Sequence, residues 1–464
     1  MAIETAQNQV PLGMIAKGAS TSPISTTFDV LSRYYLFTDS HQKAWWEKTG
    51  RLFDKILASA GYNPARRLEA LTFYSQVLIP QLGPYPYEFH SAITRSGLPV
   101  EFSVNYQQKG DVDPVVRIGF EPVAAVSGTE QDPYNQKPPV NLLNELEKLN
   151  IPGFDPELFR YFLDAHTVNA HERGLLKEKK IEGSNLTSQA AFGFDMKEKT
   201  ISVKGYTFPA IKCNVNEKGF GNFIAESIQP LAAQMGPIPS FDMVHDYLNE
   251  TNGYSQFAFW SFDCVDPAQS RLKLYSSHNS VVWSKVEEIW TLGGRAKSPV
   301  VHQGLEYLKE LWQLTKLSEG HRDFNGGFDD GKDSTSSPMV WNYEMKKGEA
   351  SPLTKFYFPI HGESDHNVIT GLAEFLSRIG LSKYGDNYEA TVQHYLYDIP
   401  SPVNLTSTSP LILNSPERDL SKTARLTSWI SFAYTEKTGV YLSVYYHSSD
   451  EYPWLKLEEA EQSN

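Results

Sequence analysis

Ten segments of the chain have the alternating apolar and polar pattern of β-strands, and they come in five pairs. They are rich in β-branched and aromatic residues, as strands are. Connectors such as 197–199 and 436–438 are short enough for antiparallel hairpins. The paired segments are 98–107 with 114–123, 189–196 with 200–212, 255–265 with 270–277, 338–345 with 355–362, and 426–435 with 439–448.

Segments with a helical period separate these pairs, and each has a single apolar stripe. The stripes are formed by Trp45, Trp46, Leu52, Phe53, Ile56 and Leu57; by Leu142, Leu146 and Leu149; by Leu305, Leu308, Leu311 and Trp312; and by Leu372, Phe375, Leu376 and Ile379. One-sided helices must pack on something, and a closed sheet has no exposed edges. We therefore predict an α+β fold with one ten-stranded antiparallel barrel inside a ring of helices. Two or three separate α+β domains are the alternative, but no Pro/Gly/Ser-rich linker divides the chain.

The second strand of each pair places charged residues and tyrosines on one face, because residues i, i+2 and i+4 point the same way. The opposite faces are apolar, for example Ile118 and Phe120, or Leu272 and Leu274. If those apolar faces pack on the helices, the barrel interior receives five cations and several tyrosines. The predicted interior residues are Arg117, Gly119 and Glu121; Lys204, Tyr206 and Phe208; Arg271, Lys273 and Tyr275; Lys355 and Tyr357; and Tyr441, Ser443 and Tyr445.

Five buried cations are costly unless an anion occupies the interior. A diphosphate suits them, since Arg and Lys form charge-assisted hydrogen bonds to phosphate. Aromatic rings stabilise a cation by about 0.5–2 kcal/mol each. Together these groups suggest ionisation of an allylic diphosphate, with the carbocation shielded from water. For a single lysine, an outward solvated position would be the better interpretation. The same cation-x-Tyr spacing on three strands favours the interior.

Composition changes the picture in three ways. The net charge of −13 argues against a nucleic-acid binder, and two cysteines cannot form a disulfide framework, which indicates a reducing compartment. No secretory signal or membrane span is recognisable, so we expect a cytoplasmic protein. Length alone suggests about three domains, whereas the strand pattern predicts one domain over 28–454. We expect 1–27 to be disordered and 455–464 to be a flexible acidic tail.

Several motifs, in order along the chain, resemble the fungal indole prenyltransferases of the dimethylallyltryptophan synthase superfamily. These are GLPVEFSVN (97–105), RIGFEP (117–122), SGTEQDPYN (127–135), VKGYTFP (203–209), SRLKLY (270–275), EEIWTLGG (287–294), KFYFPIHG (355–362) and YLSVYYHS (441–448). The resemblance covers about residues 28 to 454. It is closest to the enzymes that reverse-prenylate tryptophan-containing cyclic dipeptides, of the brevianamide F type. It implies the αββα prenyltransferase (PT) barrel, which agrees with the strand count.

The resemblance also implies roles for individual residues. Arg117, Lys204, Arg271, Lys273 and Lys355 match the diphosphate-binding positions, and Tyr206, Tyr275, Tyr357, Tyr441 and Tyr445 match the tyrosine shield. Glu101 matches the catalytic carboxylate that accepts the indole N–H. Members that alkylate indole carbon 4 have a lysine at the position of Ala191. The absence of this lysine argues against alkylation at carbon 4 and against free tryptophan as the acceptor. Trp429 replaces a tyrosine found in some relatives, and together with Ala191 it is expected in the acceptor pocket. Lys355 stands where some relatives have glutamine.

Residues 326–333, GGFDDGKD, imitate two unrelated sites. Asp329, Asp330 and Asp333 form the D-D-x-x-D pattern of magnesium-dependent prenyl-diphosphate enzymes, but the glycines disfavour the helix that this pattern needs. A P-loop would need Ser or Thr at Asp333. We interpret the segment as a flexible acidic loop. The histidines and cysteines have no metal-ligand spacing either, so no metal site is predicted.

The sequence thus predicts a prenyltransferase that moves a dimethylallyl group from dimethylallyl diphosphate to the indole of a tryptophan-containing cyclic dipeptide. The expected reaction is a metal-independent Friedel–Crafts alkylation in indole alkaloid biosynthesis, a reverse prenylation at indole carbon 2 or 3 that requires no cofactor. The partners are small molecules rather than nucleic acid or membrane, and the protein is a monomer or a homodimer. The alternatives are prenylation of free tryptophan or another aromatic acceptor, a non-catalytic hydrophobic carrier barrel, and a magnesium-dependent terpene cyclase.

Overall fold

The computed structural model describes residues 26–179, 187–255, 257–329, 337–396 and 420–448. Ten of its strands form one barrel, and two very short strands pair separately. The barrel strands are β1 (Val100–Gln107), β2 (Val115–Phe120), β3 (Ala190–Met196), β4 (Ile201–Thr207), β5 (Phe259–Asp263), β6 (Leu272–His278), β9 (Met339–Met345), β10 (Leu353–Phe358), β11 (Thr427–Thr435) and β12 (Gly439–Tyr446); the separate pair is β7 (Ser280–Val281) and β8 (Gly320–His321).

The barrel is closed, and every neighbouring pair of strands is antiparallel. Around the barrel the order is β1-β12-β11-β10-β9-β6-β5-β4-β3-β2, so β1 pairs with β12 and the sheet has no free edge. Each of the five predicted hairpins is present, and the predicted barrel is confirmed. The predicted strand 200–212 is too long, because β4 ends at Thr207 and the helix α8 begins at Ala210.

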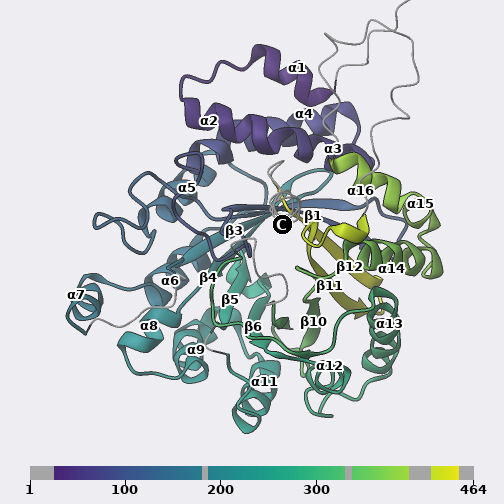
Figure 1. Ribbon diagram of the computed structural model, residues 1–464. Helices are drawn as coiled ribbons and strands as arrows, with labels where there is room; N and C mark the ends of the chain where they lie inside the picture. The colour runs from purple at the N-terminus through teal and green to yellow at the C-terminus, as the bar shows by residue number, and fades with distance from the viewer. Residues whose placement is uncertain (1–25, 180–186, 256, 330–336, 397–419, 449–464) are drawn as a thin grey trace, which may run out of the picture.

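Helices surround the barrel on its outside (Figure 1). They are α1 (Thr27–Tyr34), α2 (Ser40–Trp45), α3 (Arg51–Ser59), α4 (Pro64–Phe73), α5 (Lys137–Lys148), α6 (Glu157–His166), α7 (Ala170–Lys179), α8 (Ala210–Val215), α9 (Phe220–Ile228), α10 (Ala232–Met235), α11 (Pro239–Glu250), α12 (Trp283–Trp290), α13 (Pro299–Thr315), α14 (Asp365–Arg378), α15 (Ser382–Gly385) and α16 (Tyr388–Leu396). The segments Trp46–Gly50 and Tyr74–Leu78 are π-helical turns that continue α2 and α4.

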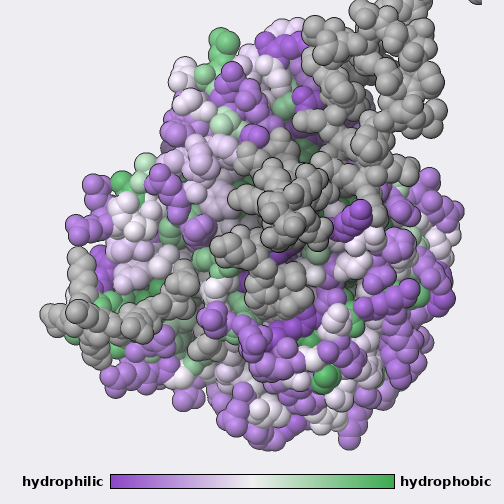
Figure 2. All heavy atoms as spheres, viewed as in Figure 1, coloured by the Kyte–Doolittle hydropathy of each residue, from purple (hydrophilic) through white to green (hydrophobic). Residues whose placement is uncertain are grey.

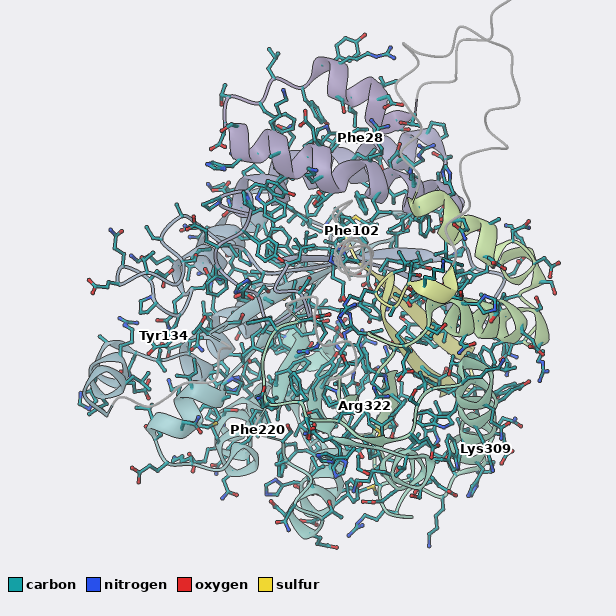
Figure 3. The ribbon with its side chains drawn as sticks, in the orientation of Figure 1. Phe28, Phe102, Tyr134, Phe220, Lys309 and Arg322 are labelled. Atoms are coloured by element: carbon teal, nitrogen blue, oxygen red, sulfur yellow. The ribbon has the colours of Figure 1, made fainter. Side chains whose placement is uncertain are left out.

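The hydrophobic core lies between the helices and the outward faces of the strands. Phe102 of β1, labelled in Figure 3, stacks on Phe53 of α3, with ring centroids 4.8 Å apart. The predicted helix stripes are largely buried, but Leu149 is 46% exposed because α5 ends at Lys148. The outer surface of the helices is mostly hydrophilic in the view of Figure 2. Because the apolar faces of the strands pack in this core, the opposite face of the sheet points toward the barrel interior.

One glycine shows how closely the layers approach. A Cβ atom at Gly205 of β4 would lie 2.4 Å from Phe262 and 2.6 Å from Phe159 of α6. Only a residue without a side chain allows this contact between strand and helix. Among the described residues, no helix is long and apolar enough to cross a membrane. The predicted terminal segments, 1–27 and 455–464, lie almost wholly outside the described residues; α1 begins at Thr27, capped by Thr26.

Candidate active site

The barrel encloses a cavity of about 260 Å³. Its walls are the inward faces of the strands, and the segments Ala92–Arg95 and Phe324–Phe328 also contribute to its lining. The predicted site residues in the lining are Glu101, Arg117, Lys204, Tyr206, Arg271, Lys273, Tyr275, Lys355, Tyr357, Trp429, Tyr441 and Tyr445. Ala191 lies outside this lining set. It is fully buried opposite Tyr206, so its methyl group is covered by protein rather than exposed to the cavity.

Two further predicted interior positions differ in detail. Gly119 lies in the lining, directly across from Glu101. Glu121 is fully buried beyond the end of β2, and it accepts hydrogen bonds from Ser91 (2.5 Å) and Ser188 (2.6 Å). Asn135 donates a third, at 2.9 Å. Burial raises the pKa of Glu121 to about 7. Through these hydrogen bonds, Glu121 holds the chain just before Ala92–Arg95 against the end of the barrel.

Four of the five predicted cations form ion pairs with carboxylates of the neighbouring strands. Lys204 and Arg117 contact Asp195 at 2.6 Å and 3.2 Å. Asp263 contacts both Arg271 (2.5 Å) and Lys273 (3.0 Å). These cations hold the pKa of Asp263 well below its usual range, although burial alone would raise it.

Glu344 completes the set by contacting Arg271 at 3.2 Å. Asp195, Asp263 and Glu344 therefore supply part of the counter-charge that the sequence argument assigned to a bound anion. Asp195 and Glu344 are in the cavity lining, and Asp263 lies behind Arg271 and Lys273, which are. The three carboxylates lie on the first strand of their hairpins, and the alternation of side chains along 189–196, 255–265 and 338–345 is the sequence signal that places them on the inward face.

Lys355 is the exception among the five. No carboxylate of the described residues lies within 4.0 Å of its ammonium, which instead lies 4.7 Å from the ring centroid of Tyr441. Burial, together with the nearby Arg117, lowers the pKa of Lys355 to about 7, while Glu344 acts in the opposite direction. Lys355 is thus the cation of this site that is readiest to lose its proton.

Four of the predicted shield tyrosines form a continuous chain of rings. The centroids are 6.2 Å apart between Tyr206 and Tyr275, 5.9 Å between Tyr275 and Tyr357, and 6.1 Å between Tyr357 and Tyr445. Phe259 stacks on Tyr275 at 4.1 Å. Such a wall presents several aromatic faces to a cation and excludes water.

Tyr441 belongs to a different part of the cavity. Its hydroxyl accepts a hydrogen bond from the Arg117 guanidinium, and its ring lies 5.3 Å from that group. Because Lys355 lies over the same ring, Tyr441 is placed among the cations rather than in the chain of rings. Tyr206, Tyr275 and Tyr357 each follow a lysine by two residues, and Tyr445 follows Tyr441 by four. These spacings separate the chain of rings from the group of cations along the strands.

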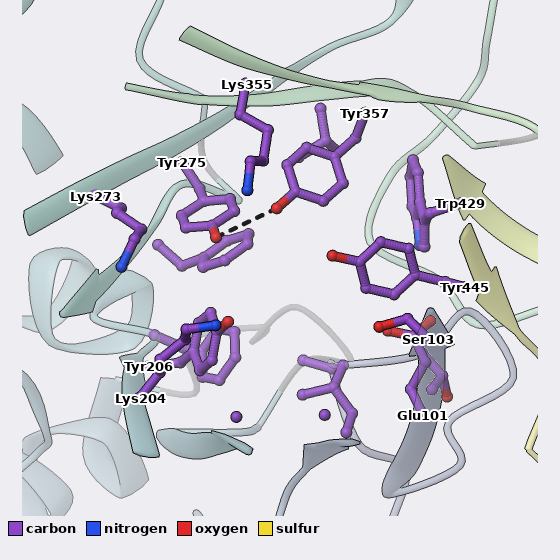
Figure 4. A pocket seen from close by; sticks show the side chains of 18 of the residues that line it. Glu101, Ser103, Lys204, Tyr206, Lys273, Tyr275, Lys355, Tyr357, Trp429 and Tyr445 are labelled. Carbon is purple, nitrogen blue, oxygen red and sulfur yellow. Dashed lines mark hydrogen bonds between the residues drawn. The ribbon is translucent and has the colours of Figure 1, made fainter. Parts of the chain in front are cut away.

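In Figure 4, Glu101 lies across the cavity from Lys204 and Lys273, on the side of Tyr445 and Trp429. Its carboxylate accepts a hydrogen bond of 2.8 Å from Ser428. Burial raises the pKa of Glu101 to about 8, and the Ser428 hydrogen bond opposes that shift. The register between β11 and β12 shifts between Thr427 and Trp429. This bulge allows the consecutive residues Ser428 and Trp429 both to face the interior, which a regular strand forbids.

The segment from Phe324 to Asp329 is tied to the segment that precedes β1. Arg95 donates a hydrogen bond of 2.6 Å to the Gly327 carbonyl, and its guanidinium lies 4.7 Å from the Phe324 ring centroid. Asp329 pairs with the fully buried Arg425 at 2.6 Å and with His361 at 2.5 Å. These contacts bring two segments far apart in sequence into one cavity wall.

The same contacts show how the fold uses Asp329, the first aspartate of the D-D-x-x-D pattern. Asp329 is engaged by Arg425 and His361, and Asp330 and Asp333 lie outside the described residues. Within the described part of the chain, no three His, Cys, Asp or Glu side chains are grouped so that they could hold a metal ion. Gly327 and Phe328 of this motif line the cavity instead.

Comparison with known proteins decides the family. Residues 41–391 match the family described as tryptophan dimethylallyltransferase. The chain belongs to this family. It is therefore a prenyltransferase, and the prediction of an enzyme is confirmed.

Individual relatives agree with this assignment. Prenyltransferase phqI of Penicillium fellutanum is 83% identical over 99% of this chain and 100% of its own length. The reverse prenyltransferase criA of Aspergillus cristatus is 41% identical over 92% of this chain and 95% of its own length. The crystal structure of NotF in complex with brevianamide F and DMSPP superposes with a TM-score of 0.78 at 37% identity, covering 93% of this chain and all of that one. The PT barrel is thus the fold of both.

Proposed function

We propose that this enzyme transfers a dimethylallyl group from dimethylallyl diphosphate to the indole ring of a tryptophan-containing cyclic dipeptide, by reverse prenylation at indole carbon 2 or 3. The observation that carries the proposal is the division of one cavity into three zones. Cations occupy one side, a chain of tyrosine rings crosses the middle, and Glu101 with Trp429 lies opposite (Figure 4).

The cationic side binds the diphosphate. Arg117, Lys204, Arg271, Lys273 and Lys355 donate hydrogen bonds to its oxygens and stabilise the negative charge that grows as the allylic C–O bond breaks. The bonding pair leaves with the diphosphate, and the allyl cation remains. Tyr206, Tyr275, Tyr357 and Tyr445 shield this cation from water, and Tyr441 positions Arg117.

The indole lies on the side of Glu101. The carboxylate accepts the indole N–H, which orients the ring and raises its electron density toward the cation. A ring carbon attacks the allyl cation and forms the new C–C bond, while Glu101 takes up the proton that the substrate must lose. The second product is the free diphosphate, so charge and atoms balance.

A neutral acceptor fits the remaining walls. Outside the cations and tyrosines, the cavity lining includes apolar side chains, among them Ile93, Phe257, Phe324 and Val340. The guanidinium of Arg95 is engaged by the Gly327 carbonyl and the Phe324 ring. A zwitterionic free amino acid would need both of its charges paired, whereas a cyclic dipeptide carries neither charge. The family's own description keeps free tryptophan as the alternative acceptor.

The test incubates the full chain with dimethylallyl diphosphate and a panel of tryptophan cyclic dipeptides, with free tryptophan included, in the presence of a chelator. Product structures are then determined by NMR. We expect turnover of at least one cyclic dipeptide, a C–C bond from the tertiary allyl carbon, and no effect of the chelator, because protein cations occupy the role of magnesium. Absence of product with every dipeptide would overturn the acceptor, and loss of activity in the chelator would overturn metal independence. A non-catalytic carrier would bind the acceptors without forming product.

A further inference from the structure

Cations and carboxylates alternate from strand to strand around half of the barrel. In the strand register, Arg117 of β2 lies opposite Asp195 of β3, and Lys204 of β4 lies opposite Asp263 of β5. Lys273 of β6 lies opposite Glu344 of β9. Directly opposite residues on antiparallel strands are close enough for their side chains to interact. We call these six residues, together with Arg271 and Lys355, the charged belt.

The pairing of directly opposite charges ends at Lys355. Its cross-strand neighbour on β9 is Asn342, a neutral residue, where the pattern would place a carboxylate. Asn342 is 1% exposed, and its amide oxygen has no hydrogen-bond partner among the described residues. Its amide nitrogen lies 3.4 Å from the Tyr357 hydroxyl. The belt therefore holds five cations and three carboxylates, and its positive excess is concentrated at the position that faces Asn342.

We propose that Asp195, Asp263 and Glu344 are resident counter-ions that limit the affinity of the site for diphosphate, and that the neutral Asn342 leaves Lys355 available to pair with it. This inference rests on the proposed donor site. Five uncompensated cations would hold the diphosphate product as firmly as they hold the donor. Carboxylates that share the same lysines and arginines compete with both anions, so they keep product release possible.

The position of Asp263 makes it the sharpest place to test the idea. One of its oxygens accepts from Lys273 at 3.0 Å and the other from Arg271 at 2.5 Å, and Lys204 is its cross-strand neighbour. Replacing it with asparagine removes one negative charge from the centre of the belt without changing the side-chain size. Asn342→Asp is the reverse change, since it adds the missing carboxylate opposite Lys355.

The experiment measures the dissociation constant of inorganic pyrophosphate by isothermal titration calorimetry on the full chain. We expect Asp263→Asn to tighten binding about tenfold and Asn342→Asp to weaken it about tenfold, with both effects shrinking at high salt. The inhibition constant of pyrophosphate in the prenylation assay should move in the same directions. Unchanged or weakened binding in Asp263→Asn would overturn the proposal, because a carboxylate that only positions the cations would produce that result.

Two control variants separate charge from folding. Glu198→Gln removes one carboxylate from the exposed turn between β3 and β4, outside the belt, and should leave the pyrophosphate constant unchanged. Asp263→Glu keeps the charge and should restore the wild-type constant, and a thermal unfolding curve of each variant verifies the fold. Failure of the proposed function appears separately, as absence of prenylated product from the wild-type chain. If the wild-type enzyme forms product but Asp263→Asn and Asn342→Asp bind pyrophosphate with the same dissociation constant as the wild type, this inference alone is overturned.

Discussion

Ser428 donates a hydrogen bond of 2.8 Å to Glu101 from a bulge in β11, across the closure of the barrel from a residue 327 positions away in the chain. The acceptor is a buried carboxylate whose pKa is raised to about 8. A hydrogen bond to the ionised form lowers the pKa of a carboxyl group, so Ser428 keeps Glu101 nearer to the range in which it can accept a proton.

Replacing Ser428 with alanine should raise the pKa of Glu101 above its present value of about 8. The ionised, reactive fraction near neutral pH then falls, and kcat/KM should drop by about three- to tenfold at pH 7 and recover as the pH increases. A pH–rate profile from about pH 6 to 10 measures the shift. Ser428→Thr keeps the hydroxyl and should retain the wild-type profile; an unshifted Ser428→Ala profile would contradict the role of the hydrogen bond.

Glu101→Gln tests the carboxylate itself. An amide can still accept a hydrogen bond from the indole N–H, but it cannot take up a proton or carry the negative charge that raises the electron density of the ring. We expect kcat to fall by about a hundredfold or more, with the KM for dimethylallyl diphosphate little changed. Steady-state kinetics with each substrate varied in turn provide the measurement. Near-normal turnover would refute the assignment of Glu101 as the proton acceptor.

Lys355 should link diphosphate binding to proton uptake. Burial, together with the neighbouring cations Arg117, Lys204 and Arg271, lowers its pKa to about 7 against an opposing effect of Glu344. A bound diphosphate favours the charged form, so the complex holds a proton that the free enzyme has lost above pH 7. The dissociation constant of pyrophosphate should therefore increase as the pH rises from about 7 to 8.

Lys355→Gln is the matched control for this effect. It should weaken pyrophosphate binding and remove the pH dependence that begins near 7, leaving a dependence near 8 that comes from Lys204, whose pKa burial lowers to about 8. Calorimetry in two buffers of different ionisation enthalpy counts the protons directly. Equal proton uptake by the wild type and the variant would assign the effect to another group.

Gly119 should influence acceptor binding. A Cβ atom at this position would lie 3.6 Å from the Cβ of Glu101 and 3.8 Å from its Oε2, an ordinary contact that leaves the fold intact. The added methyl group would occupy space beside the carboxylate that receives the indole. For Gly119→Ala we expect the acceptor KM to rise about fivefold and the donor KM to stay constant. A change confined to the donor KM would place the indole elsewhere.

Arg425 should stabilise the cavity wall formed by Phe324–Asp329. It is fully buried and pairs with Asp329 at 2.6 Å. Replacing Arg425 with methionine removes the charge from one side of a buried ion pair, which costs about 3–5 kcal/mol of folding free energy. Urea unfolding measures the loss. The double variant Arg425→Met/Asp329→Asn should recover part of it, and equal stabilities of the single variant and the wild type would contradict the prediction.

Much of the site was predictable because it follows from local alternation. Once the apolar faces of β2, β4, β6, β10 and β12 are assigned to the core, the opposite residues must face inward, and the cations and tyrosines of the predicted site do line one cavity. The three carboxylates follow the same alternation on the first strand of their hairpins, so the sequence contains a local signal for them as well. Alternation alone could not predict that Ala191 lies outside the cavity lining, because its side chain is a single methyl group and neighbouring residues cover it.

Other features have no local signal. The bulge that turns both Ser428 and Trp429 inward is a register shift between two strands, and register depends on the pairing of residues distant in sequence. The junction of Arg95 with Gly327 joins segments that sequence alone gives no reason to pair. The family resemblance implied the role of Glu101, but it contained nothing about the serine that adjusts its acidity.

The sequence by itself determined the strands, the hairpins, the inward cations and tyrosines and the family, because each of these depends on residue type and on a spacing of a few positions. Only the tertiary structure decided how the charges are compensated, which tyrosines touch one another, and what surrounds Glu101. Those properties depend on distances across the barrel, where closure brings β12 beside β1 and sets each cation against a particular neighbour. Electrostatic interactions are set by such distances and by burial, and neither is written in the local order of residues.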